Sequence, residues 1–285
     1  MSGPRVTLLG DEPDDPVVAY VIAAQADPAR HVTFVGEGET TVRSDLTAID
    51  GWREQTYVAR DDTGQVVGVL LVDTDEELAR CWWLGPWADD GEVARALLAA
   101  AEPLVAPLPR REFAPDSRNT WLADLAASLG YGERPVNAIL ELDLADWVGA
   151  TDTSHVTVLD PDDWDVVATL HDRLFPDTHT PGRRLVRDAD TLVLVTGEPP
   201  HGYLATQDQD DGSLYVDFLG VDPGSRRRGL ARDLLTETLS RAAARGIDRA
   251  YLTVHATNTA ARALYASLGF EEERLIAPWM LAPRR

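Results

Sequence analysis

Residues 221–231, with the sequence VDPGSRRRGLA, decide the fold of this chain. The apolar stretch 214–221 before them predicts a strand, and leucines at helical spacing over residues 230–239 predict a helix after them. Three arginines and a glycine therefore lie at a strand-to-helix turn. Unpaired backbone N–H groups and the positive end of the helix dipole meet at such a turn, so this site suits a phosphate or pyrophosphate.

A second motif follows about 30 residues later. After a predicted strand, residues 258–270 read NTAARALYASLGF. Asn258 is placed to cap a helix, Tyr265 lies within that helix, and Leu-Gly-Phe ends it. Together with Arg226-x-x-Gly229-x-Ala231, this motif resembles the two signatures of the GNAT acetyltransferase superfamily. The resemblance covers residues 152–285 well and the first half only faintly. In organisation the chain resembles the mycothiol synthases, a tandem group of that superfamily, and its C-terminal motifs also resemble those of ribosomal-protein N-terminal acetyltransferases.

The chain contains an internal repeat. A shift of 139 residues aligns Asn119-Thr120 with Asn258-Thr259 and aligns residues 127–131 with 266–270. Upstream, Leu84-Gly85 echoes Leu219-Gly220 at a slightly smaller offset. A repeat of this length indicates two copies of one domain, because solenoid periods are shorter. We place the domains at residues 1–145 and 146–285. The fold class is α/β (α+β), and the resemblance implies two tandem GNAT folds, each a mixed, mostly antiparallel sheet flanked by helices.

Hydrophobic patterning predicts the elements of both copies. The first copy is predicted to contain strands at 6–9, 55–60, 66–72, 81–84 and 136–142, and helices at 16–26, 93–105 and 121–129. The second copy is predicted to contain strands at 155–159, 191–195, 203–206, 214–221, 250–254 and 278–281, and helices at 162–174, 231–244 and 259–268.

The first copy has lost the anion-binding turn. In its place stand residues 87–92, with the sequence WADDGE, and the connection is shorter by about four residues. Three carboxylates at a helix start suit the helix dipole but repel a phosphate. Position 126, which aligns with Tyr265, is alanine. We therefore predict a degenerate, non-catalytic first domain.

The resemblance assigns roles in the second copy, where acetyl-CoA is the implied co-substrate. The strand residues Leu219, Gly220 and Val221 would lie along the pantetheine arm, paired through their backbone groups. Asn258 would contact the cofactor, with simple helix capping as a compatible alternative. Tyr265 would protonate the leaving thiolate, or else is a core aromatic. The pyrophosphate would bind the turn formed by Arg226, Arg227, Arg228, Gly229, Leu230 and Ala231. Within this turn, Arg227 or Arg228 could instead be solvated.

The general base is less clear from the sequence. Asp217 lies two residues before Leu219, so strand alternation puts both side chains on one face, and Asp217 is the candidate base. The alternative is a structural or solvated carboxylate. His255 is expected to be a structural histidine, and His171 and His179 are candidates for the substrate pocket. We expect Trp82, Trp83 and Trp87 in the core or at a domain interface. No spacing of cysteine, histidine and carboxylates predicts a metal site.

Composition restricts the function classes. The chain has 285 residues and a net charge of −22, and all 26 basic residues are arginine. This acidity argues against nucleic acid as a partner and weakly favours a cationic small-molecule amine as substrate. The single cysteine, Cys81, excludes an internal disulfide, and no apolar run reaches the length of a membrane span. We expect a cytoplasmic N-acetyltransferase. The alternatives are a non-enzymatic acyl-CoA sensor and a protein N-terminal acetyltransferase, and the oligomeric state is left open.

Overall fold

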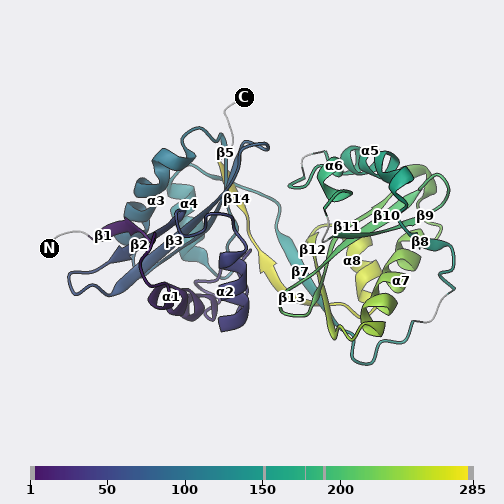
Figure 1. Cartoon of the computed structure of the whole chain (residues 1–285), viewed down its shortest axis with the longest axis horizontal. Coiled ribbons are helices and arrows are strands. Elements are labelled where there is room, and N and C mark those ends of the chain that lie inside the picture. Colours follow the sequence, from purple (N-terminus) through teal and green to yellow (C-terminus); the bar gives the residue numbers. More distant parts are fainter. Residues whose placement is uncertain (1–3, 150–151, 177, 189–190, 282–285) are drawn as a thin grey trace. The chain divides into compact units, whose positions relative to one another are not determined.

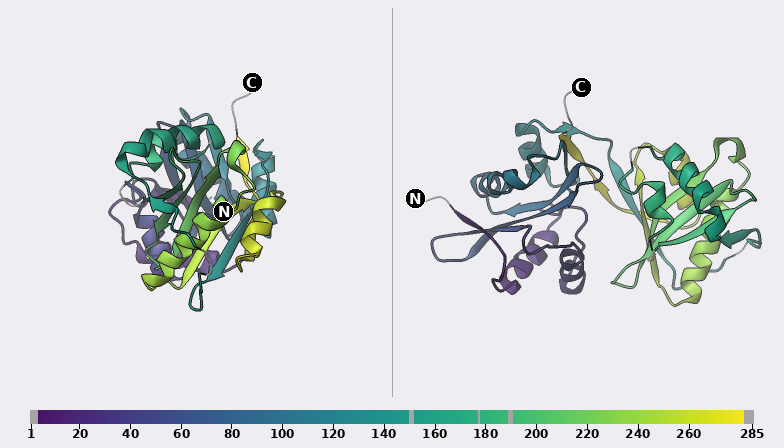
Figure 2. Two further views of the ribbon diagram at one scale, coloured as in Figure 1. Left: turned by 90° about the vertical axis from the view of Figure 1, so that its right-hand side faces the viewer. Right: turned by 45° about the horizontal axis from the view of Figure 1, so that its top comes forward.

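The structure, a computed structural model, describes residues 4–149, 152–176, 178–188 and 191–281. The chain forms two compact units, which we call unit 1 (residues 1–137 and 274–285) and unit 2 (residues 138–273). In each unit a mixed sheet carries helices on both of its faces (Figures 1 and 2). None of the helices in the described ranges is both long and apolar enough to cross a membrane.

Unit 1 contains a seven-stranded sheet in the order β1-β2-β3-β4-β5-β14-β6. In Figure 1, α1 and α2 lie on one face of this sheet and α3 on the other. Strands β4 and β5 are parallel, whereas the ladders from β1 to β4 are antiparallel. The elements are β1 (Arg5–Leu8), α1 (Asp15–Gln25), α2 (Glu39–Thr47), β2 (Thr56–Arg60), β3 (Val66–Asp75), β4 (Arg80–Ala88), α3 (Gly91–Val105), β5 (Arg110–Phe113), α4 (Thr120–Ser128), β6 (Gly132–Glu133) and β14 (Trp279–Leu281).

Unit 2 repeats this plan, with the strand order β13-β7-β12-β11-β10-β9-β8. Helices α5 and α6 lie on one face of its sheet and α7 on the other (Figure 1). Strands β11 and β12 form the parallel pair. The elements are β7 (Asn137–Asp143), β8 (Val156–Val158), the 3-10 turn η1 (Pro161–Asp163), α5 (Trp164–Leu174), α6 (Gly182–Leu185), β9 (Thr191–Thr196), β10 (Gly202–Asp208), β11 (Leu214–Val221), the 3-10 turn η2 (Pro223–Ser225), α7 (Leu230–Ala244), β12 (Arg249–His255), α8 (Thr259–Ala266) and β13 (Glu271–Ile276).

The last strand of the chain belongs to the first sheet. In β14, Trp279 pairs with Phe113 of β5 and with Glu133 of β6. Conversely, β7 follows the helices of the first copy but lies in the second sheet, between β13 and β12. The compact units therefore do not divide at residue 145, because each sheet takes a terminal strand from the other half of the sequence.

The tryptophans expected in a core or an interface belong to the core of unit 1. Trp83 stacks on Phe113 at 5.9 Å between ring centroids and donates its indole N–H to the Tyr131 hydroxyl at 2.9 Å. Trp87 is fully buried. Trp82 is only half-buried, with the guanidinium of Arg80 4.9 Å from its ring.

The predicted strands and helices are found, most of them within two residues of their expected ends. The strand predicted to end at Leu84 instead continues to Ala88, so part of the expected loop is strand. The final strand exists, but in the first sheet. The sequence patterns do not predict α2, α6, β5, β6 and β13.

Candidate active site

The parallel strands β11 and β12 separate halfway along their length. Their ladder joins Tyr215 to Tyr251 and Val216 to Leu252, and there it ends. Both strands nevertheless continue, to Val221 and His255 respectively. The β12-facing edge of residues 217–221 is thus left without a ladder partner among the described residues. An extended ligand can add to such an edge as a further strand would, through backbone hydrogen bonds.

A β-bulge lies where the strands separate. Ala205 of β10 pairs with Phe218, but the next residue, Thr206, pairs with Val216, so Asp217 has no partner across the ladder. A bulge interrupts the regular alternation of side chains and can redirect one of them. Here Asp217 and its neighbour Phe218 both contact the ring of His179. The bulge leaves Asp217 without a ladder partner, but residue burial along β11 still alternates as the sequence predicted, with Asp217 and Leu219 in the same class.

The turn after β11 has the conformation of an anion-binding turn. Arg227 and Gly229 both have positive φ, +65° and +89°, and Gly229 precedes the first residue of α7 without a capping side chain. Among the described residues, the N–H groups of positions 226–231 donate to no protein acceptor. A helix start with unpaired N–H groups and a positive dipole attracts an anion.

The arginines of the turn are exposed and carry no ion pair within the described ranges. Arg226 donates only its Nε, to the carbonyl of Val221 at 3.1 Å. The two nearby carboxylates have other partners. Asp222 accepts from the Gly224 N–H, contacts Arg173, and has a lowered pKa for these reasons. Asp233 lies 3.2 Å from the His155 ring. The positive charge of the turn is therefore not neutralised locally.

Gly220 has a packing role that the sequence did not show. A Cβ atom at this position would lie 2.5 Å from the Tyr203 ring and 2.9 Å from Leu174. The glycine therefore lets β11 pass over Tyr203, a fully buried residue of the unit 2 core. Its neighbours Leu219 and Val221 are half-buried on the strand that separates from β12.

Asn258 and Tyr265 occupy the two ends of α8. Asn258 caps the helix, since its side-chain oxygen accepts from the Ala261 N–H at 3.2 Å, and its side chain is exposed. Tyr265 is 7% exposed and meets Phe270 edge to face. Burial raises the pKa of Tyr265 to about 12, so the phenol stays protonated at neutral pH. Tyr215 lies within electrostatic reach of both Tyr265 and Asp217, and these groups and burial raise its pKa.

The Asp217 carboxylate is buried and poorly satisfied. Its side chain is 3% exposed, and Oδ1 has no hydrogen-bond partner among the described residues. The nearest cation-forming group is His179, whose Nε2 lies 3.4 Å from Oδ1. Burying a carboxylate oxygen without a donor is costly, so the presence of Asp217 here points to a role beyond packing.

A second histidine anchors the loop that carries His179. His171 Nε2 donates to the carbonyl of Thr180 at 2.8 Å, and its Nδ1 accepts from the Tyr203 hydroxyl at 2.7 Å. Burial lowers the pKa of His171, which favours the neutral imidazole that donates from Nε2 and accepts at Nδ1. Burial also raises the pKa of Tyr203, which keeps its proton for this bond. His171 is therefore structural, and only His179 of the two predicted pocket histidines faces Asp217.

The other candidates are placed as follows. His255 is exposed at the end of β12, and no described residue bonds to its ring, so it is not the satisfied structural histidine expected from the sequence. Among the residues that the structure describes, no group of three or more histidines, cysteines or carboxylates could hold a metal ion.

Comparison with known proteins agrees with this geometry. Residues 137–270 match the sequence profile of the Acetyltransferase (GNAT) family. The second half of the chain belongs to this family. A tandem GNAT protein from the clavulanic acid biosynthesis pathway has a similar fold, with a TM-score of 0.65 at 14% identity over 99% of this chain and 100% of that one. The whole chain therefore has the fold of two tandem GNAT domains.

Two curated relatives are mycothiol acetyltransferases. The protein of Clavibacter michiganensis subsp. michiganensis is 34% identical over 158 residues, which are 51% of this chain and 47% of that protein. The protein of Clavibacter sepedonicus is 28% identical over 287 residues, which cover 95% of this chain and 78% of that protein. The first alignment thus spans about half of either chain.

Proposed function

We propose that this protein transfers an acetyl group from acetyl-CoA to the primary amine of a small molecule, at a site in unit 2. The observation that carries the proposal is the separation of β11 from β12, which opens beside Asp217 and leads to a turn of free N–H groups and unpaired arginines. This combination offers backbone edges to an amide-containing arm and positive charge to a pyrophosphate.

The residues present fit acetyl-CoA as the donor. The turn from Arg226 to Ala231 would hold the pyrophosphate, because its N–H groups and arginines have no competing carboxylate. The free edges of Leu219 and Val221 would pair with the pantetheine arm, and Asn258, which is exposed, would contact the cofactor. When bound, acetyl-CoA supplies an acetyl group activated as a thioester.

The chain's own groups would move the protons of the reaction. The amine nitrogen forms a bond to the acetyl carbon and loses a proton, while the carbon–sulfur bond breaks and the thiolate gains one. Tyr265 remains protonated at neutral pH and would donate to the sulfur. Asp217 would supply negative charge on the side of the attacking amine, since its carboxylate is buried and its Oδ1 has no hydrogen-bond donor among the described residues.

Two further features concern the substrate. A mycothiol acetyltransferase aligns over 95% of this chain and a ribosomal-protein alanine N-acetyltransferase over only 22%, which favours a small molecule over a protein terminus. A buried carboxylate in a chain of net charge −22 favours a cationic amine. A non-enzymatic acyl-CoA sensor would need the same turn, but it would have no use for a buried, unsatisfied carboxylate beside the strand opening.

The test is release of free thiol from acetyl-CoA by the full chain, against a panel of aminoglycosides, amino sugars, amino-acid conjugates, polyamines and peptides. We expect turnover with at least one small amine and formation of its acetamide by mass spectrometry. Tight acetyl-CoA binding without turnover on any amine would favour the sensor. Turnover restricted to peptides would favour a protein N-terminal acetyltransferase.

A further inference from the structure

The loop between α5 and α6 brings a histidine to the buried carboxylate of β11. His179 and Asp217 stand 38 positions apart in the sequence, yet His179 Nε2 lies 3.4 Å from Asp217 Oδ1. The ring of His179 stacks on Phe218, with 5.3 Å between centroids and 24° between planes. Stacking fixes the plane of the imidazole, and the carboxylate fixes which nitrogen faces inward.

The two members of the pair differ in exposure. The Asp217 side chain is 3% exposed, whereas that of His179 is 50% exposed. Nε2 faces the carboxylate, and Nδ1 has no hydrogen-bond partner among the described residues. The carboxylate is therefore too buried to meet a substrate freely, and the imidazole is the part of the pair that solvent and a ligand can reach.

Hydrogen bonds hold the backbone on the C-terminal side of His179. The adjacent carbonyl of Thr180 accepts a hydrogen bond from the buried His171 ring. The other ring nitrogen of His171 is hydrogen-bonded to the Tyr203 hydroxyl. Gly182 donates its N–H to Asp172 at 2.7 Å, on the far side of the same loop. Side chains that act on a substrate need such support, because small misplacements are costly in rate.

We propose that His179 accepts the proton of the attacking amine, with Asp217 as its positioning carboxylate. This inference rests on the proposed acetyl transfer and identifies the base of that reaction. The Nδ1 atom takes the proton as the nitrogen–carbon bond forms, and the resulting imidazolium is stabilised by Asp217 through Nε2–H. The carbon–sulfur bond breaks and Tyr265 protonates the sulfur. The phenol recovers its proton from the imidazolium through solvent, so no other reactant is needed.

The groups that face this pair come from three elements. His171 and Asp172 lie on α5, Tyr203 on β10, and Tyr215 on β11 beside Asp217. His171 is held neutral, and both tyrosines have pKa values raised by burial, so they keep their protons at neutral pH. Since His179 is the proposed base, we expect its replacement to alter the acidic limb of the pH–rate profile.

The experiment uses the full chain and the best amine from the thiol-release panel. We expect His179→Ala to lower kcat roughly 10²- to 10⁴-fold, the usual contribution of a general base, with acetyl-CoA affinity unchanged. Added imidazole should restore part of the turnover, and the acidic limb of the profile should disappear. Asp217→Asn should lower kcat without rescue by imidazole. His255→Gln, which removes an exposed histidine of the same unit, should behave as the unaltered chain.

Several results would overturn the proposal. An increase in KM alone, with an unaltered pH profile, would show that His179 contacts the substrate but does not accept its proton. Normal turnover in His179→Ala together with loss of activity in Asp217→Asn would make the carboxylate act alone. Either result leaves acetyl transfer intact, because the unaltered chain is active in both. If the unaltered chain acetylates no amine, the proposed function itself fails.

Discussion

Units 1 and 2 use one framework, and the register of their sheets shows where they differ. In unit 1, Gly68 pairs with Ala88 and Val72 pairs with Trp83. In unit 2, Gly202 pairs with Val221 and Thr206 with Val216 in the same way. Four residues lie between these anchor pairs in each unit: Leu84, Gly85, Pro86 and Trp87 in unit 1, and Asp217, Phe218, Leu219 and Gly220 in unit 2. The register thus matches Leu219-Gly220 with Pro86-Trp87, and not with Leu84-Gly85 as the sequence echo suggested.

Each of these replacements removes a feature of the proposed site. None of the four residues of unit 1 is a carboxylate in place of Asp217, and Leu84 among them is fully buried. Pro86 stands in place of Leu219 and has no N–H to offer to a ligand. Trp87 stands in place of Gly220, where its large side chain is 1% exposed. Unit 1 has thus lost the carboxylate and one backbone donor of this strand.

The opening itself is also closed in unit 1. The segment 31–36 lies along the end of β5, with Thr33 N–H donating to Ala114 at 2.8 Å and Asp116 N–H donating to His31 at 3.1 Å. The buried side chain of Gln25 holds this segment, donating to the carbonyls of Val32 and Val35 and accepting from the Trp87 indole at 2.9 Å. In unit 2 the corresponding end of β12 is exposed.

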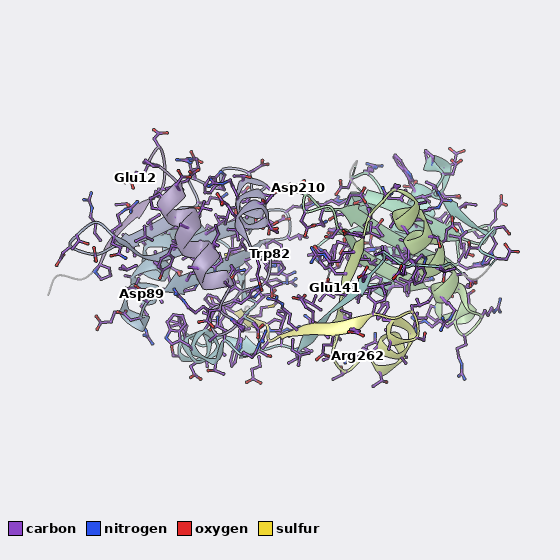
Figure 3. The ribbon with its side chains drawn as sticks, turned by 90° about the horizontal axis from the view of Figure 1, so that it is seen from below. Glu12, Trp82, Asp89, Glu141, Asp210 and Arg262 are labelled. Atoms are coloured by element: carbon purple, nitrogen blue, oxygen red, sulfur yellow. The ribbon has the colours of Figure 1, made fainter. Side chains whose placement is uncertain are left out.

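The strand-to-helix turns and the helix caps of the two units also differ, and again the unit 1 features are less suited to binding a ligand. Unit 1 has two residues between strand and helix where unit 2 has eight, a larger difference than the four residues expected. Asp90 caps α3 by accepting from the N–H groups of positions 92 and 93, so its carboxylate occupies the place that an anion would take. Figure 3 shows its neighbour Asp89 at the surface of unit 1. The side-chain N–H of buried Asn119 donates to the His31 carbonyl, whereas the side chain of the equivalent Asn258 is exposed.

The comparison predicts its largest effect at Tyr265. The equivalent residue of unit 1 is Ala126, and both positions accept the same 3.1 Å backbone bond, from Phe270 and Tyr131 respectively. Tyr265→Phe should lower kcat roughly 10²- to 10⁴-fold and leave acetyl-CoA affinity nearly unchanged, because the hydroxyl acts only as charge develops on sulfur. Thiol release gives kcat and calorimetry gives the affinity. The matched control Tyr131→Phe, in unit 1, should turn over normally. Normal turnover in Tyr265→Phe would show that Tyr265 serves only in packing and is not the general acid.

A smaller effect concerns the segment that closes unit 1. His31 is 4% exposed, and burial lowers its pKa from 6.5 to about 4. Between these values the unfolded chain binds a proton that the folded unit does not, so unit 1 should lose stability as the pH falls through this window. The loss amounts to roughly 3 kcal/mol at pH 4.

Urea unfolding followed by tryptophan fluorescence measures this loss, because Trp83 and Trp87 lie in the core of unit 1. His31→Gln should show a weaker dependence on pH between 6.5 and 4 than the unaltered chain. Equal slopes for the two proteins would show that His31 titrates normally in the folded state.

The parts of the structure that local patterns determine could be predicted from the sequence. The strand at 214–221 was predicted to the residue, since it is an apolar run bounded by a turn. The Asn258 cap followed from its position before a helical pattern. Strand β13 was missed because its glutamates mask the strand pattern, and β14 was placed in the wrong sheet because strand pairing is non-local.

The candidate site likewise has a part that local sequence motifs predict and a part that depends on contacts between distant residues. The resemblance to a family pointed to the arginine turn, and the structure gives that turn free N–H groups. The pairing of His179 with Asp217 could not be predicted, because it depends on a bulge and on a loop anchored by His171. The closure of unit 1 by Gln25 and Trp87 likewise joins residues 62 positions apart. A tryptophan aligned with a glycine would have been the available signal, but only the sheet register gives that alignment.

The central claim is that unit 2 alone binds acetyl-CoA, and calorimetric titration of the full chain tests it most directly. We predict one site per chain. Arg226→Glu should weaken it roughly 10- to 100-fold, the range for loss of a hydrogen bond to a charged group. Gly229→Asp should weaken it further, because that position has φ of +89° and would gain a negative charge. Gly91→Asp, at the helix start of unit 1, should leave binding unchanged. Two equal sites per chain, or one site that survives Arg226→Glu and Gly229→Asp but is lost in Gly91→Asp, would contradict the account.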